Sequence, residues 1–234
     1  MLYFKVLLLI LWLILASTLG LIYAVLRWGY TNTNRDFARV FSWGALKILG
    51  IRVKTEGAQY LNTQPCIYVV NHQSGLDMVT MGPMYPQRTV VIGKKEVAWV
   101  PFFGIFYIAA GNVIIDRKKT NKAVAGLNQV VEAIRNRGLS IWIFPEGTRN
   151  RTGEGILPFK RGAFHMAIQA GVPIVPVVCS QLSKLVSIKG GYARSGSMTV
   201  QVLPPVFPTE YSVATVEKMA DDVRAMMVKA LQAT

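Results

Sequence analysis

Hydrophobic residues are most concentrated near the N-terminal end of the chain. Residues 6–26 form a run of 21 uncharged positions. As an α-helix this run would be about 31 Å long, which is close to the hydrocarbon thickness of a bilayer. A secretory signal peptide would have a shorter apolar region, of about 7–15 residues, followed by a small-residue cleavage site. The run is longer and shows no clear site, so we expect a membrane-associated helix that either spans the bilayer or lies in one leaflet.

A second helix is expected over residues 34–49. Apolar and aromatic residues recur there at helical spacing, and basic residues on the same helix are available to lipid headgroups. Two interpretations remain open: this helix docks on the membrane with the first as a hairpin, or it is a core helix of the following domain. The apolar face consists of Phe37, Val40, Phe41, Gly44 and Ile48, and the basic residues are Arg35, Arg39 and Lys47.

Beyond residue 50, short apolar runs alternate with helical patterns, which is typical of an α/β domain. No internal repeat, low-complexity tract or linker divides this part. We therefore expect two regions, the membrane-associated helices of residues 1–50 and one domain of residues 51–234. Strands are expected at residues 51–55, 66–70, 89–92, 112–115, 140–144, 174–179 and 198–203, and helices at residues 123–134, 163–170 and 216–231.

The charge balance indicates an anionic partner. The chain of 234 residues has 26 basic and 12 acidic residues and a net charge of +14, while 52% of its residues are hydrophobic. Nucleic acid is the generic candidate for such a charge, but the sequence has no nucleic-acid fold signature. A basic chain that begins with a bilayer-length apolar helix is better explained by anionic membrane lipids, so we expect no nucleic-acid partner.

Basic residues lie near both ends of the first apolar run, and the larger cluster, with Arg35 and Arg39, follows it. This asymmetry favours a cytoplasmic location for the C-terminal side, so we expect the domain of residues 51–234 on the cytoplasmic side of the membrane. Cys66 and Cys179 both lie in apolar strands and are expected to be buried thiols rather than a disulfide or a metal site. No metal-ligand cluster is visible in the sequence.

The most informative short segment is residues 71–77, which reads NHQSGLD. His72 and Asp77 are five positions apart, a spacing that points the two side chains apart on a regular helix or strand, so they can meet only across a bend. His72 would then lie on a strand-to-helix turn. We expect Gly75 to take an unusual backbone angle and Ser74 to cap a helix running through residues 78 and 79.

An imidazole held by a carboxylate through one ring nitrogen leaves the other nitrogen free to accept a proton, which is what a general base needs. The alternative is a loop histidine that only caps a helix or bonds a backbone carbonyl. Ser74 is a conceivable nucleophile, but no G-x-S-x-G elbow surrounds it.

The sequence Asn71-His72 followed by Asp77 resembles the NHx4D motif of the glycerolipid acyltransferases, in particular of bacterial members that acylate lysophosphatidic acid. Three further blocks resemble this family in the same order: residues 111–117 (GNVIIDR), 144–150 (FPEGTRN) and 172–176 (VPIVP). The resemblance implies an α/β fold with a central mixed sheet flanked by helices. It also implies transfer of an acyl chain from acyl carrier protein or coenzyme A to the sn-2 hydroxyl of lysophosphatidic acid. The product would be phosphatidic acid, and no cofactor is expected.

Under this resemblance His72 is the general base and Asp77 stabilises the imidazolium. Arg149 is the main candidate ligand for the acceptor phosphate, because a guanidinium suits forked binding. Glu146 would bond either a substrate hydroxyl or Arg149. The remaining candidate substrate-binding residues are Gly147, Thr148, Arg117 and Lys160.

Residues 99–108 form an uncharged aromatic stretch that is either ordinary core, the lining of an acyl-chain tunnel or a bilayer contact. Two alternatives to the function also remain open. One is an acyltransferase for another lyso-lipid, such as a lyso-ornithine lipid. The other is a catalytically idle protein that binds anionic lipid surfaces.

Overall fold

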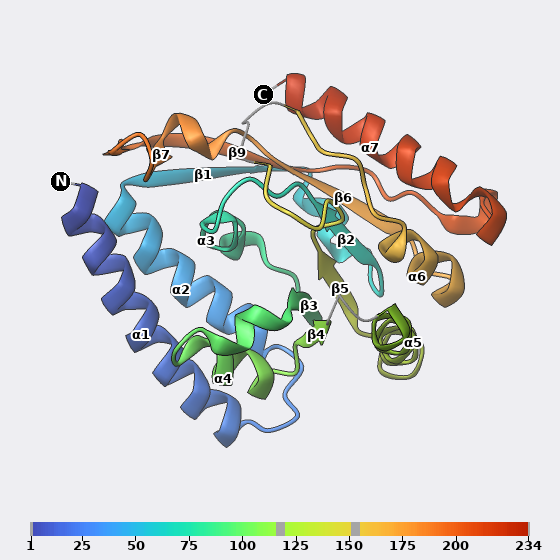
Figure 1. Ribbon diagram of the computed structural model, residues 1–234, viewed down its shortest axis with the longest axis horizontal. Coiled ribbons are helices and arrows are strands. Elements are labelled where there is room, and N and C mark those ends of the chain that lie inside the picture. Colours follow the sequence, from blue (N-terminus) through green and yellow to red (C-terminus); the bar gives the residue numbers. More distant parts are fainter. Residues whose placement is uncertain (1, 116–119, 151–154, 234) are drawn as a thin grey trace.

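The computed structural model describes residues 2–115, 120–150 and 155–233, and in this part of the chain the fold is built on a seven-stranded sheet (Figure 1). The strand order is β1-β9-β6-β2-β5-β3-β4, and neighbours run parallel except for β6 and β9. The expected mixed sheet is confirmed, and each strand lies within two residues of its expected bounds. The strands are β1 (Ile51–Glu56), β2 (Ile67–Val70), β3 (Thr89–Lys94), β4 (Val113–Ile115), β5 (Ser140–Ile143), β6 (Ile174–Cys179) and β9 (Gly196–Val202).

Helices cover both faces of the sheet (Figure 1). One layer contains α1 (Leu2–Leu26), α2 (Thr33–Leu49), α3 (Asp77–Met81) and α4 (Phe103–Ala109), and the other contains α5 (Thr120–Arg137), α6 (Gly162–Ala170) and α7 (Val216–Gln232). A small hairpin, β7 (Val186–Ser187) and β8 (Tyr192–Ala193), was not expected, since strands of two residues are too short to show an alternating pattern. Short 3-10 helices include η2 (Gly82–Met84), η3 (Lys95–Trp99) and η4 (Leu182–Lys184).

Alternating side chains of the central strands form two separate cores. In β2, Ile67 and Val69 pack with α5, α6 and α7, whereas Tyr68 and Val70 pack with α2 and α3. A strand that is buried on both faces reads as a continuous apolar run, which is why the runs in the sequence located these strands so closely.

Helices α1 and α2 form an antiparallel hairpin that is tied together along its whole length. The Lys5 ammonium donates to the Leu49 carbonyl (2.9 Å), the Trp12 indole N–H donates to the Phe41 carbonyl (2.8 Å), and the Tyr23 hydroxyl donates to the Asp36 carboxylate (2.9 Å). The hairpin therefore lies along the domain instead of projecting from it, and its second helix packs on α3 through buried residues such as Ala45.

The outer face of this layer is apolar and exposed. By length and composition α1 is able to cross a membrane, and only 11% of its most apolar window is buried. Exposed large hydrophobic residues continue from α1 onto α2 and onto the segment around α4. They include Leu7, Leu11, Leu15, Leu19 and Ile22 on α1, Val40 and Trp43 on α2, and Trp99, Phe102, Ile105 and Ile108 around α4. A contiguous apolar surface of this kind marks contact with a partner or a membrane.

The close approach of α1 to α2 requires a glycine at position 44. A methyl group there would lie 2.3 Å from the Trp12 ring, which the hydrogen bond to Phe41 holds in place. At Gly126, inside α5, an added methyl group would meet only Ile115 among the described residues, at 3.7 Å.

We expect Gly44→Ala to destabilise the protein by about 1–3 kcal/mol, because overpacking outweighs the helix propensity gained. The matched control Gly126→Ala should be neutral or stabilising by up to about 1 kcal/mol. Thermal unfolding in detergent micelles measures both. Equal stability of the two variants would show that the α1–α2 contact does not constrain the fold.

Candidate active site

The candidate site forms where several parallel strands end together. Strand β2 lies between β5 and β6 and runs parallel to both, and β3 runs parallel to β5. Their carboxyl ends therefore meet at one edge of the sheet, which is the usual ligand-binding edge of an α/β fold. His72 follows β2 and Glu146 follows β5, so the two loops open onto one cleft, as we expected from the sequence.

His72 and Asp77 meet across the strand-to-helix turn. The His72 Nδ1 atom lies 2.7 Å from Asp77 Oδ2, which also accepts the backbone N–H groups of Gln73 (2.8 Å) and Ser74 (3.0 Å). Asp77 is the first residue of α3 and is 1% exposed. Because a carboxylate only accepts hydrogen bonds, Nδ1 carries the proton, and Nε2 is left to accept one.

Two details of this turn differ from our expectation. Ser74 does not cap α3, whose N-cap is Leu76; its hydroxyl instead accepts the Leu76 N–H (3.2 Å). The Asp77 carboxylate, in the first turn of α3, accepts the N–H groups of Gln73 and Ser74 before the helix, so these groups need no serine cap. Gly75 is not among the residues with positive φ. A methyl group at Gly75 would lie 3.7 Å from the guanidinium carbon of Arg149, which places Arg149 beside the turn.

Asn71 and Gln73 anchor the turn to the end of β6, a role that we did not expect from the sequence. The Asn71 side chain accepts the Cys179 N–H (2.7 Å) and donates to the Cys179 carbonyl (3.1 Å). Gln73 donates to the same carbonyl (2.7 Å) and accepts the Leu182 N–H (3.3 Å). A buried asparagine at the end of an apolar strand was the only available signal, and its partner is 108 residues away.

The third block holds the backbone of His72 on both sides. Glu146 Oε1 accepts the His72 N–H (2.6 Å), and the Asn150 N–H donates to the His72 carbonyl (2.7 Å). Glu146 is 4% exposed, and its Oε2 accepts the Leu157 N–H (3.1 Å). Burial raises the pKa of Glu146, and the N–H groups of His72 and Leu157 partly oppose this shift. Both oxygens of Glu146 thus bind backbone amides, which is neither of the two roles considered from the sequence.

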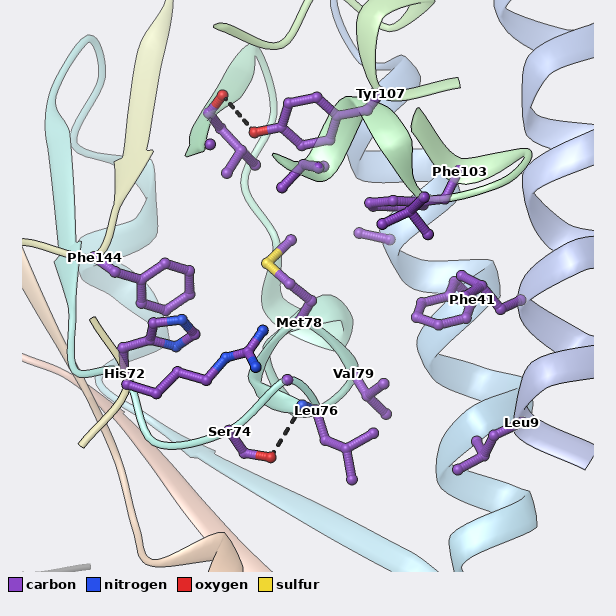
Figure 2. Close-up of a pocket in the computed structure, with 18 of the residues that line it drawn as sticks. Leu9, Phe41, His72, Ser74, Leu76, Met78, Val79, Phe103, Tyr107 and Phe144 are labelled. Atoms are coloured by element: carbon purple, nitrogen blue, oxygen red, sulfur yellow. Dashed lines mark hydrogen bonds between the residues drawn. The ribbon is translucent and has the colours of Figure 1, made fainter. Parts of the chain in front are cut away.

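His72 lines a cavity of about 800 Å³ that runs from the motif to the layer of α1, α2 and α4. Phe144 stacks on the imidazole with ring centroids 4.2 Å apart, and Figure 2 shows His72 and Phe144 together across the cavity from Phe103 and Tyr107. The walls are mostly apolar, with Leu9, Phe41, Met78 and Val79 among the lining residues. The expected aromatic stretch of residues 99–108 contributes both to this lining and to the exposed apolar face.

The charged residues among those that line the cavity are Lys5, Lys94, Glu96 and Arg149. Gly147 and Thr148 also line it, and Gly147 has φ +71°, which favours glycine. Lys94 ends β3 and was not singled out from the sequence, since a lysine in a basic chain gives no distinguishing signal. Lys160 is exposed and lies outside the lining of the cavity, and Arg117 lies outside the described residues.

Among the described residues, no group of three or more histidines, cysteines and carboxylates could hold a metal ion. The two thiols are buried, as expected, and burial raises the pKa of Cys66 and of Cys179 to about 12, so neither is a nucleophile at neutral pH.

Comparison with known proteins identifies the family. The sequence pattern of the acyltransferase family matches residues 52–180, which is more than half of the chain and includes His72, Asp77, Glu146 and Arg149. The chain belongs to the acyltransferase family. It is similar to the 1-acyl-sn-glycerol-3-phosphate acyltransferase of Haemophilus influenzae, with 40% identity over 92% of this chain and 89% of that protein. The protein of the same name from Escherichia coli K12 is 38% identical over 96% of this chain and 90% of its own length.

The fold of this acyltransferase is also similar to that of a solved structure. The crystal structure of the 1-acyl-sn-glycerophosphate acyltransferase from Thermotoga maritima matches with a TM-score of 0.75 and covers 100% of this chain and 99% of that one, at 24% identity. The similarity includes the N-terminal helical hairpin, since it extends over the whole chain.

We expect the buried carboxyl of Glu146 to give the protein a specific pH dependence. Its pKa is raised in the folded state, so the folded protein binds the proton more tightly than the unfolded chain does. The stability of the wild type relative to Glu146→Gln should therefore be largest below about pH 4.5, the ordinary pKa of glutamate, and should fall as the pH rises through the folded-state value. Urea unfolding in micelles at a series of pH values measures the difference. A difference that grows with pH would show that the backbone N–H groups outweigh burial.

Proposed function

We propose that this acyltransferase transfers an acyl chain from a thioester to the sn-2 hydroxyl of 1-acyl-sn-glycerol-3-phosphate (lysophosphatidic acid), which forms phosphatidic acid. The observation that carries the proposal is the His72–Asp77 pair, 2.7 Å apart, at the head of an apolar cavity that also receives Arg149. The names of relatives at about 40% identity over nearly the whole chain support the same reaction.

In this mechanism Nε2 of His72 removes the proton of the acceptor hydroxyl as its oxygen attacks the thioester carbon. The thiolate of the donor leaves, and the proton on the imidazole neutralises it. Asp77 holds the ring through Nδ1 and stabilises the imidazolium by its charge. The stacked Phe144 and the backbone bonds from Glu146 and Asn150 fix the position of the ring, and no covalent enzyme intermediate is required.

The acceptor phosphate would bind at Arg149. Arg149 is exposed beside the catalytic turn and offers a forked set of donors, and Lys94 adds a second positive charge to the lining. We keep Arg117 and Lys160 as secondary candidates for contact with the anionic substrates. The apolar part of the cavity, between α3, α4 and the α1–α2 hairpin, would hold an acyl chain.

The acyl donor would be the thioester of acyl carrier protein or of coenzyme A. We propose no further cofactor, because side chains at the cavity can supply the base and the anion site that the reaction needs. The exposed apolar face formed by α1, α2 and α4 would bind the membrane. Because α1 is tied to α2 at three points along its length, we propose that it lies in one leaflet rather than spanning the bilayer alone. Arg39 and Lys47, exposed on α2, would contact anionic headgroups at the cytoplasmic face of an inner membrane.

We expect His72→Ala to reduce turnover by roughly 100-fold or more, because the general base is lost. Asp77→Asn should also lower kcat steeply, since it keeps the shape of the side chain and removes the charge that supports the imidazolium. Transfer of a labelled acyl chain to lysophosphatidic acid in mixed micelles measures both.

His165→Ala is the matched control, because His165 lies on α6, away from the cavity, and its loss should leave kcat unchanged. Activity of His72→Ala near that of the wild type would refute the mechanism. Loss of turnover in His72→Ala, Asp77→Asn and His165→Ala alike would indicate that the substitutions impair folding in general.

We expect Arg149→Lys to raise the KM for lysophosphatidic acid and to lower kcat, since a point charge replaces a forked donor and misplaces the hydroxyl relative to His72. The KM for the acyl donor should change little. Arg149→Ala should raise this KM and lower kcat further. It should also reduce the preference for phosphate-bearing acceptors over phosphate-free ones, such as a lyso-ornithine lipid.

Arg52→Lys on the edge strand β1 is the control, because Arg52 is exposed and remote from the cavity. Rates on both acceptors are compared for wild type and Arg149→Ala. Equal proportional losses on the two acceptors would show that Arg149 supports the fold or the donor instead of the phosphate.

A further inference from the structure

The C-terminal helix contacts the loop that follows the third block. Arg224 of α7 is half-buried, and its guanidinium donates to two successive backbone carbonyls: Nε to Ile156 (3.0 Å) and Leu157 (3.1 Å), and Nη2 to Ile156 (2.5 Å). Bonds from a charged donor to backbone carbonyls are stronger than neutral ones, and two adjacent acceptors fix the direction of the loop.

The Ile156 carbonyl belongs to the same peptide group as the Leu157 N–H, which donates to Glu146 Oε2 (3.1 Å). The planar, resonant peptide group therefore lies between a guanidinium cation on its oxygen and a carboxylate on its N–H. Each of these contacts polarises the group in the same sense, so that each strengthens the other. The other oxygen of Glu146 accepts the His72 N–H at 2.6 Å.

The same loop reaches His72 by a second connection. The Asn150 side chain donates to the Gly155 carbonyl (3.2 Å), and the Asn150 N–H donates to the His72 carbonyl (2.7 Å). Both backbone groups of the catalytic histidine are thus bonded to residues whose positions depend on residues 155–157.

Helix α7 is a firm support for this contact. Ile156 (3% exposed) packs in the same core as Val223 and Met227 of α7, each 0% exposed, and α7 packs on β6 on the face of the sheet opposite α1–α4 (Figure 1). Arg224 is outside the cavity and contacts no residue of the His72–Asp77 pair directly.

We infer that Arg224 is a positioning residue for the acyl-transfer reaction, and that it acts through the Ile156–Leu157 peptide and Glu146 on the backbone of His72. This inference rests on the proposed function, because the activity measured is acylation of lysophosphatidic acid. The C-terminal helix α7 would then affect the reaction rate, although it lies outside residues 52–180, the region that matches the family.

The test is a double-mutant cycle with Glu146. We expect Arg224→Gln to lower kcat for acylation of lysophosphatidic acid by about 10-fold, since a small displacement of a catalytic group has a large effect on rate, while the KM values of donor and acceptor stay within about twofold. The kcat of Arg224→Lys should lie between those of the wild type and Arg224→Gln, because an ammonium group keeps the positive charge but lacks the forked donors of the guanidinium. In a Glu146→Gln background, Arg224→Gln should reduce kcat by less than about threefold, because the route through the carboxylate is already broken.

Lys229→Gln, which removes an exposed charge from the same helix, is the matched control and should not change kcat. An equal loss from Arg224→Gln in both backgrounds, or a wild-type kcat in Arg224→Gln, would overturn the inference. If Arg224→Gln does not fold, the same comparison is made with Arg224→Lys.

Amide hydrogen exchange separates this inference from the proposed function. The N–H groups of His72 and Leu157 should exchange faster in Arg224→Gln and at the wild-type rate in Lys229→Gln, whether or not lysophosphatidic acid is the acceptor. Unchanged exchange of both amides in Arg224→Gln would refute the inference that Arg224 acts on His72 through the Ile156–Leu157 peptide and Glu146. Absence of acylation by the wild type together with altered exchange would refute the proposed function alone.

Discussion

The candidate site depends on one buried carboxylate, that of Asp77. A single oxygen of this side chain accepts Nδ1 of His72 and the N–H groups of Gln73 and Ser74, so it closes the turn after β2 and orients the imidazole at once. A buried carboxylate needs hydrogen-bond donors, and the turn supplies three of them to Oδ2, whereas the buried Oδ1 has no hydrogen-bond partner among the described residues. The orientation of the His72 ring and the conformation of the backbone are therefore consequences of the same set of contacts.

The neighbours of β2 in the sheet complete the arrangement. Because β5 and β6 flank it in parallel, the loops after all three strands lie together, and each contributes to holding the turn that carries His72. Asn71 ties the turn to the end of β6, while Glu146 and Asn150 tie the backbone of His72 to the loop after β5. Several residues of the shared motifs thus position the histidine instead of reacting.

The layer of α1, α2 and α4 has two apolar surfaces. Its inner surface lines the cavity that begins at His72, and its outer surface exposes large hydrophobic residues. In the proposed function this arrangement lets a lipid acceptor reach the base without leaving an apolar environment. The absence of a side chain at Gly44 leaves room for the Trp12 ring, so the two helices approach closely in this layer.

The sequence determined those features that depend on local patterns. The central strands are continuous apolar runs, and the sequences of β1 and β9 alternate apolar with polar residues, so all seven strands of the main sheet were located. A five-residue spacing allowed His72 and Asp77 to meet only across a turn. Other features depend on which distant segments become neighbours. The backbone partners of Glu146, the entry of Lys94 into the cavity and the link from Arg224 to Leu157 all join residues brought together by strand order and helix packing. No local spacing encodes such contacts, because a hydrogen bond between a side chain and a distant backbone group leaves no periodic trace in the sequence.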